Sequence, residues 1–210
     1  MRPKAWWFIV AFCTGFLLAM AAEELVVHSQ DDELHIVAPR LHFLAGASLD
    51  RLKNGAAVPY DFQLSLSLDS RTNLFDRAVE RIAVSYDVWD EKFSATRLSA
   101  SSTLRGAVSR RSHERRSVSN LTQQGVENWC IDNLAVSTSG IGPSQWLWVR
   151  LEVRSVEPKE APPLFSDSGV SLNRLIDLFS HPPRTGQQRW TLEAGPLRLS
   201  DIRKPVARGS

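Results

Sequence analysis

The sequence predicts an α+β protein that is mainly β, with an antiparallel sheet or sandwich of about seven strands and two or three short helices packed on it. Several segments alternate apolar and polar residues, as in 58–68. Connections between segments are short, and strands do not alternate with helices as they would in a parallel sheet. With 210 residues, 43% hydrophobic and 23% charged, the chain can form a core of its own, which excludes a wholly disordered protein.

The predicted strands are short segments with extended, mostly alternating patterns. They comprise residues 24–28, 34–43, 58–68, 79–88, 93–98, 145–156 and 189–199. Pro39 favours an edge strand or a bend in the second segment, and Gly195-Pro196 is expected to break the last. A turn at 89–92 makes its two flanking strands a hairpin, and a loop rich in Ser and Arg follows over 99–117.

Three segments have the apolar spacing typical of amphipathic helices. They cover residues 48–55, 119–134 and 171–180. Ser48 is a suitable N-cap for the first helix, and Ser119 or Asn120 for the second. Gly125 weakens the second prediction, because glycine lowers helix stability by about 1 kcal/mol relative to alanine.

The first 21 residues are typical of a secretory signal peptide. Arg2 and Lys4 precede an uncharged stretch over residues 5–22, and Ala19-Met20-Ala21 forms a small-x-small cleavage site. We expect cleavage after Ala21 or the alanine that follows it. The alternative is an uncleaved anchor, because a stretch of this length can just span a bilayer. The sequence therefore predicts export to the bacterial periplasm or cell envelope.

The rest of the chain is expected to form one antiparallel β-rich domain over residues 22–200. A proline-rich insertion is expected near 157–188, and a frayed tail over 201–210. The whole chain has 25 basic and 23 acidic residues, and removal of the signal peptide would make the two numbers equal. Such a balance excludes whole-surface binding to nucleic acid.

One cysteine, Cys130, remains after the signal peptide, so the mature chain has no intrachain disulfide. Its neighbours Trp129 and Ile131 are apolar. We expect a buried, unreactive thiol, because burial in apolar surroundings disfavours the thiolate.

Catalytic and metal-binding signatures are missing from the sequence, which has no Walker sequence, GxSxG, GxGxxG, HExxH or CxxC. His28, His35 and His42 are spaced by seven, but in a continuous strand His35 would face away from the other two. The acidic groups Asp31-Asp32-Glu33 and Asp90-Glu91 lie in expected turns. We therefore expect no catalytic residue, no metal and no cofactor.

Arginine is concentrated in residues 105–116, where Glu114 is the one acidic residue. The candidate anion contacts in this run are Arg105, Arg110, Arg111, Arg115 and Arg116. Guanidinium groups on a loop suit phosphate-bearing lipid headgroups or an acidic partner. The alternative, which we favour, is a solvated loop in a chain that uses arginine heavily. No aromatic residue interleaves with the run, which argues further against nucleic acid.

Trp146, Trp148 and Arg150 share one face of the strand predicted over 145–156. If that face is exposed to solvent, the three residues form a candidate contact for a partner protein. If a helix covers it, the two tryptophans belong to a second core layer. We favour the core, because the amphipathic helices need a surface to cover.

Several motifs follow one another in a recognisable order. A short helix ends in Asn-Gly at 49–55 (LDRLKNG) before an alternating strand at 58–64 (VPYDFQL), and a hairpin with a tyrosine follows at 84–93 (VSYDVWDEKF). A helix over 117–134 then precedes a strand with alternating arginines at 148–154. This order resembles a family of uncharacterised exported bacterial proteins, a domain-of-unknown-function group, over roughly residues 41–156. The resemblance implies export and a common scaffold, with no catalytic residues to carry across.

These observations predict a non-enzymatic exported domain that binds another protein of the envelope. The first alternative is a carrier of lipid or of a small amphiphile, with an apolar cavity lined by Leu64, Leu66, Val149 and Leu151. The second alternative is a hydrolase of unrecognised type, which needs a histidine and a carboxylate to converge in a cleft. Contact with a membrane is expected only through an uncleaved N-terminal segment.

Overall fold

The computed structural model describes residues 25–98, 117–132, 134–156, 172–183 and 186–202, which contain nine strands and four helices. The strands are β1 (Val26–Gln30), β2 (Glu33–Val37), β3 (Val58–Leu68), β4 (Leu74–Asp87), β5 (Lys92–Arg97), β6 (Ser117–Leu121), β7 (Ala135–Ser137), β8 (Trp146–Ser155) and β9 (Arg189–Arg198). The helices are α1 (Gly46–Lys53), α2 (Gln123–Asp132), α3 (Leu172–Ser180) and α4 (Leu199–Ile202). The prediction of a mainly β, antiparallel α+β fold is confirmed.

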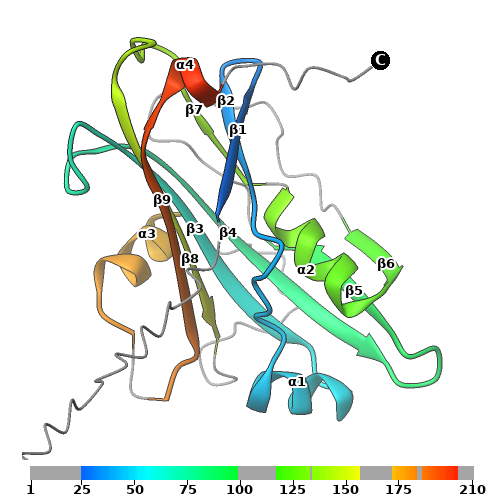
Figure 1. Ribbon diagram of the computed structural model, residues 1–210. Helices are drawn as coiled ribbons and strands as arrows, with labels where there is room; N and C mark the ends of the chain where they lie inside the picture. Colours follow the sequence, from blue (N-terminus) through cyan, green and yellow to red (C-terminus); the bar gives the residue numbers. More distant parts are fainter. Residues whose placement is uncertain (1–24, 99–116, 133, 157–171, 184–185, 203–210) are drawn as a thin grey trace, which may run out of the picture.

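A six-stranded antiparallel sheet in the order β6-β5-β4-β3-β8-β9 forms the centre of the molecule (Figure 1). Strands β4 and β3 are the two central strands, and the pleat of β3 sends alternate side chains to opposite faces of the sheet. Its apolar series is buried on one face: Val58, Tyr60, Phe62, Leu64, Leu66 and Leu68. Neighbouring strands match this series in register, since Leu64 lies opposite Ala78 on β4 and Leu151 on β8.

A second layer covers the apolar face of the large sheet. It consists of the three-stranded sheet β1-β2-β7 together with α1 and α2 (Figure 1). The side chains Leu34 and Ile36 of β2, Leu52 of α1 and Ile131 of α2 all belong to the common core. The buried carboxylate of Asp76 on β4 accepts a hydrogen bond of 3.0 Å from the backbone N–H of Ser137, which connects the two sheets.

The opposite face of the large sheet is polar and charged. The residues of β3 on this face are Asp61, Gln63, Ser65 and Ser67, and β8 contributes Trp148, Arg150, Glu152 and Arg154. Helix α3 lies on this side and contacts β4. Arg154 donates hydrogen bonds of 2.8 and 3.0 Å to the carbonyls of Leu178 and His181 at the end of α3.

The predicted helix over 119–134 is wrong in its first four residues. Residues 117–121 form strand β6, which pairs with β5 at the edge of the sheet. Helix α2 begins only afterwards, and the hydroxyl of Thr122 accepts a hydrogen bond of 3.1 Å from the N–H of Gly125. Thr122 is therefore the N-cap in place of Ser119 or Asn120, and pairing between strands outweighs the helical pattern there.

Other boundaries also differ from prediction. Strand β4 begins five residues earlier than expected, and β2 ends at Val37, before a turn at Pro39 that fits the expected bend. Ser48 does not cap α1, because its hydroxyl lies within the helix and donates to Gln188 at 2.6 Å. The short strand β7 had no counterpart among the predicted elements.

The last strand is continuous through Gly195-Pro196, where a break was predicted. Its register against β8 shifts between Leu147 and Val149. Gly195 has a φ of +127°, and a Cβ there would stand 2.7 Å from the carbonyl oxygen of Leu147. Only glycine permits this close approach, so a bulge replaces the break.

The predicted proline-rich insertion and tail are described only in part. Residues 157–171, 184–185 and 203–210 lie outside the described residues, as does the predicted signal peptide. The helix predicted over 171–180 is confirmed as α3, Leu172–Ser180. The first residues of the expected tail belong to α4, whose Leu199 is buried in the core.

Candidate functional site

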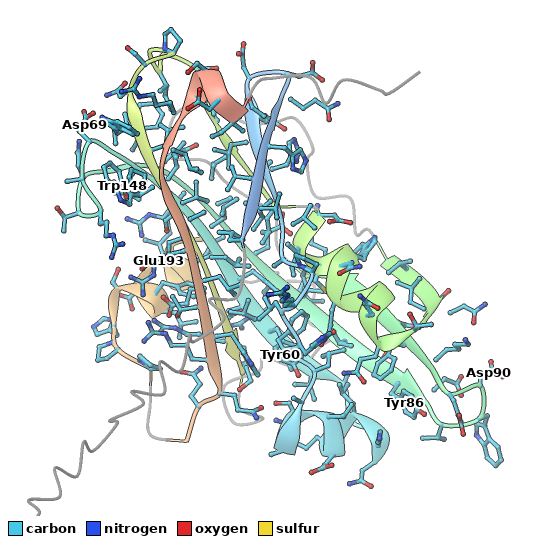
Figure 2. All side chains as sticks on the ribbon, viewed as in Figure 1. Tyr60, Asp69, Tyr86, Asp90, Trp148 and Glu193 are labelled. Carbon is cyan, nitrogen blue, oxygen red and sulfur yellow. The ribbon has the colours of Figure 1, made fainter. Side chains whose placement is uncertain are left out.

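A cleft of about 490 Å³ opens on the polar face of the large sheet, next to the end of α3. Trp148 and Phe179 are its aromatic walls. Its polar side chains include Gln63, Ser65, Arg71, Arg77, Arg150, Glu152 and Glu193. Figure 2 shows Trp148 and Glu193 on the side of the sheet where α3 lies.

The alternation in β8 places the sequence-predicted contact residues on the face that bears this cleft. Trp148 and Arg150 line the cleft, and Trp146 precedes them on the same face of the strand. Trp146 is 40% exposed, and the guanidinium of Arg198 lies 4.3 Å from the centre of its ring. The expectation of a second core layer is therefore wrong for Trp146, while Trp148 is half-buried. Helix α3 contacts β8 at Arg154, which lies at the other end of the strand from Trp146. The helix therefore leaves Trp146 exposed.

Arginines outnumber carboxylates on this face. Glu152 lies 2.6 Å from Arg154, 3.2 Å from Arg189 and 3.3 Å from Arg150. Glu193 lies 3.5 Å from Arg71 and 3.8 Å from Arg150. Two carboxylates are thus shared among four guanidinium groups. The region around the cleft consequently carries excess positive charge.

The pair of Asp61 and Arg81 is electrically balanced and lies deeper in the same face. Arg81 donates two parallel hydrogen bonds to Asp61, from Nε and from Nη2, the second at 2.7 Å. Burial raises the pKa of the Asp61 carboxyl above its ordinary value, and the bonds from Arg81 act against that rise. This pair contributes no net charge to the cleft.

Arg77 differs from the other arginines of the face. Its side chain makes no ion pair or hydrogen bond with any part of the chain that the structure describes, although it is half-buried in the cleft. Arg77 was not among the site residues predicted from the sequence. Its only signal was its place in an alternating strand, one position after the buried Asp76.

The tip of the hairpin between β4 and β5 is a second exposed feature. Trp89 is 91% exposed and Val88 is 51% exposed. The carboxylate of Asp87 accepts hydrogen bonds from the N–H groups of Trp89 and Asp90, at 2.8 and 3.2 Å, which fixes the turn. Figure 2 shows Asp90 at the end of a hairpin that extends away from the rest of the molecule. The turn was predicted from the sequence, but the exposure of its tryptophan was not.

The predicted anion contacts Arg105, Arg110, Arg111, Arg115 and Arg116 lie outside the described residues. The structure therefore does not test the prediction that these arginines contact an anion.

The histidines are arranged differently from the sequence-based expectation. The chain reverses after Gln30, so His28 and His35 face each other across β1 and β2 with their rings stacked 5.6 Å apart. The assumption of a continuous strand was wrong. His42 lies elsewhere, 3.0 Å from the carboxylate of Glu127. Within the described ranges, no group of three or more His, Cys, Asp or Glu side chains could hold a metal ion.

Two buried groups behind the sheet have structural roles. Glu127 on α2 accepts a hydrogen bond of 2.9 Å from the N–H of Leu44 and thereby holds the segment before α1. Cys130 is buried as predicted. Burial raises the pKa of its thiol, which disfavours the thiolate needed for a nucleophile.

Comparison of the chain with family models, curated proteins and solved structures found no match. The resemblance to an exported bacterial family therefore stays a prediction. Among the helices of the described residues, none is long and apolar enough to cross a membrane.

Proposed function

We propose that the protein is a non-enzymatic, exported module that binds another protein of the cell envelope. One observation carries this proposal: a tryptophan and a valine are held in solvent at the tip of a hairpin with a fixed turn. Large apolar side chains at such positions gain free energy only when a partner covers them. Tryptophan is also the residue type most enriched among the energetic centres of protein interfaces.

The structure of the hairpin supports its use as a contact element. Just below the tip, the rings of Tyr86 and Phe93 pack across the two strands with their centres 4.8 Å apart. This pair and the Asp87 turn hold the tip in one conformation, so binding would cost little ordering of the backbone. Trp146 and its neighbour Arg198 offer a second exposed contact at the far end of the sheet.

The two alternatives receive less support. All four residues predicted to line a lipid cavity are buried in the core; Val149 also borders the described cleft, whereas Leu64, Leu66 and Leu151 do not. A lipid carrier would need a cavity among those side chains. None of the four described histidines lines the cleft either, and a hydrolase would need one there.

The proposal is tested by site-specific crosslinking in cells that export the full-length protein. A photoreactive phenylalanine analogue at position 89 should yield one recurrent protein adduct, which mass spectrometry identifies. The same analogue at Asn54, an exposed residue at the end of α1, serves as the matched control and should not yield that adduct.

A second variant separates binding from stability. Trp89→Ala should abolish copurification of the same partner and leave the melting temperature within about 1 °C, because an exposed side chain contributes little to folding. Adducts that are identical from positions 89 and 54, or adducts with lipid alone, would contradict the proposal.

A further inference from the structure

We propose that the cleft on the polar face binds a small organic anion, with its carboxylate or phosphate group between Arg77 and Arg150 and its apolar part against Trp148 and Phe179. This inference is independent of the proposed protein partner. The cleft lies on the polar face of the large sheet, whereas the proposed partner contact is at the hairpin tip with Trp89.

The register of three strands places the two arginines on either side of a serine. Ser65 on β3 lies opposite Arg77 on β4 and opposite Arg150 on β8. Adjacent strands are about 4.8 Å apart, so the two arginine backbones are separated by roughly 10 Å across the row. Their long side chains can therefore converge above the serine. The hydroxyl of Ser65 accepts from Gln63 at 3.1 Å, and its own proton remains available for a ligand.

Both guanidinium groups keep hydrogen-bonding capacity that the described residues do not use. Arg77 has no carboxylate partner among them, and Arg150 shares Glu152 and Glu193 with other arginines. The Nε atoms of Arg77 and Arg150 are buried and find no acceptor within the described parts of the chain. A buried donor without an acceptor is unfavourable, and the planar fork of arginine matches the oxygens of carboxylate and phosphate groups.

The size and walls of the cleft indicate a small ligand with an apolar body. A volume of about 490 Å³ lies within the range of small-molecule sites. Trp148 and Phe179 provide ring surfaces. Two carboxylates of the cleft contact Arg150: Glu152 at 3.3 Å, which Arg154 and Arg189 also hold, and Glu193 at 3.8 Å, which an incoming anion can displace more easily. The removal of Glu193 should consequently favour the ligand.

The experiment uses phenyl phosphate as the probe, with benzyl alcohol and inorganic phosphate for comparison. Titration into the ¹⁵N-labelled protein is followed through the Nε–Hε signals of arginine by nuclear magnetic resonance. We expect saturable shifts of the Arg77 and Arg150 signals with phenyl phosphate. Inorganic phosphate should bind at least fivefold more weakly, and benzyl alcohol should shift neither signal.

Three single variants make the test specific. Arg77→Gln should weaken phenyl phosphate at least tenfold, whereas Arg40→Gln should leave affinity unchanged, because Arg40 is an exposed arginine in the turn after β2. Glu193→Gln should strengthen binding severalfold. An increase of this kind cannot result from damage to the fold. If Arg77→Gln does not fold, Arg77→Lys replaces it and should also weaken binding, because lysine lacks the fork.

The source of the anionic group is decided with vesicles that contain 30% phosphatidylglycerol in phosphatidylcholine. Cosedimentation that Arg77→Gln abolishes would assign the group to a lipid headgroup, and binding of phenyl phosphate alone would assign it to a free organic anion. Shifts that are equal at Arg40 and Arg77, or no shift up to 20 mM probe with no vesicle binding, would overturn the proposal.

Discussion

For Arg81 and Arg77 on β4, the partner depends on the residue directly opposite in β3. Arg81 lies opposite Asp61 and is neutralised by it. Arg77, four residues earlier on the same strand, lies opposite Ser65, which cannot neutralise a cation. Two residues with the same chemistry thus differ in role, one in stability and one in ligand contact, because of a single cross-strand neighbour.

The buried pair predicts a large loss of stability when it is broken. Asp61→Leu should lower the free energy of unfolding by about 3–5 kcal/mol, because the Arg81 charge would remain buried without its partner. Urea denaturation at pH 7, followed by tryptophan fluorescence, measures this loss. The double variant Asp61→Leu/Arg81→Leu should lose much less. A double variant as unstable as the single one would contradict this explanation.

Tyr60 predicts a loss of stability at high pH. Desolvation by burial raises the pKa of its phenol from 10 to about 12. Between these two values the unfolded chain releases the proton and the folded chain keeps it, so the free energy of unfolding falls as pH rises. The shift corresponds to about 3 kcal/mol by pH 12.

The variant Tyr60→Phe should remove this part of the slope between pH 10 and 12. At pH 7 its effect on the free energy of unfolding should be small, because the phenol hydroxyl is buried and the hydroxyl of its neighbour Ser48 already donates to Gln188. Tyr86→Phe, at a half-buried position, is the control and should keep the slope. The same slope in both variants would show that other groups cause it.

Helix α3 is held to the sheet by Arg154. This side chain bonds the carbonyls at the helix end and lies 4.8 Å from the centre of the Phe179 ring. A cation at a helix C-terminus is also favoured by the helix dipole. Because Phe179 is a wall of the cleft, the attachment of α3 determines whether that wall is in place.

Arg154→Gln should therefore detach α3 without unfolding the sheet. Hydrogen exchange with mass spectrometry should show at least tenfold faster exchange in residues 176–181, with unchanged protection in β3 and β8. Arg189→Gln is the matched control, because Arg189 also contacts Glu152 but not α3. Faster exchange throughout the sheet would instead indicate global destabilisation.

The strands with one apolar and one polar face could be predicted from sequence, and those at 58–68 and 145–156 were. The alternation of Leu64 with Ser65 predicts which of the two side chains is buried in the core. Strand β6 could not be predicted, because its pairing with β5 is not visible in its own residues. The cleft could not be predicted either, since Arg77 and Arg150 become neighbours of Ser65 only through the register of three strands.

The two faces of the central sheet differ: one packs against the core, and the other carries polar and charged side chains. The apolar face lies under α1, α2 and the small sheet, and the polar face carries the cleft. Cys130 is a free thiol, so the part of the chain that the structure describes is held together by packing and not by a disulfide.

If the N-terminal segment is a cleaved signal peptide, the protein recovered from the envelope should begin at Ala22 or Glu23. Intact-mass spectrometry of that protein measures the first residue directly. Replacement of Ala19 and Ala21 by Leu should block processing and leave the full-length mass. Recovery of the unaltered chain with Met1 still present would favour the uncleaved anchor.

The position of β9 at the edge of the large sheet affects how readily the protein associates in concentrated solution. Strand β9 is ten residues long and forms one end of the large sheet, where unpaired backbone groups could join a second chain. Pro196 has no N–H to donate, the bulge at Gly195 bends the strand, and Arg189, Glu193 and Arg198 place charges along it. Among the described strands, these features disfavour edge-to-edge stacking of a second chain on β9.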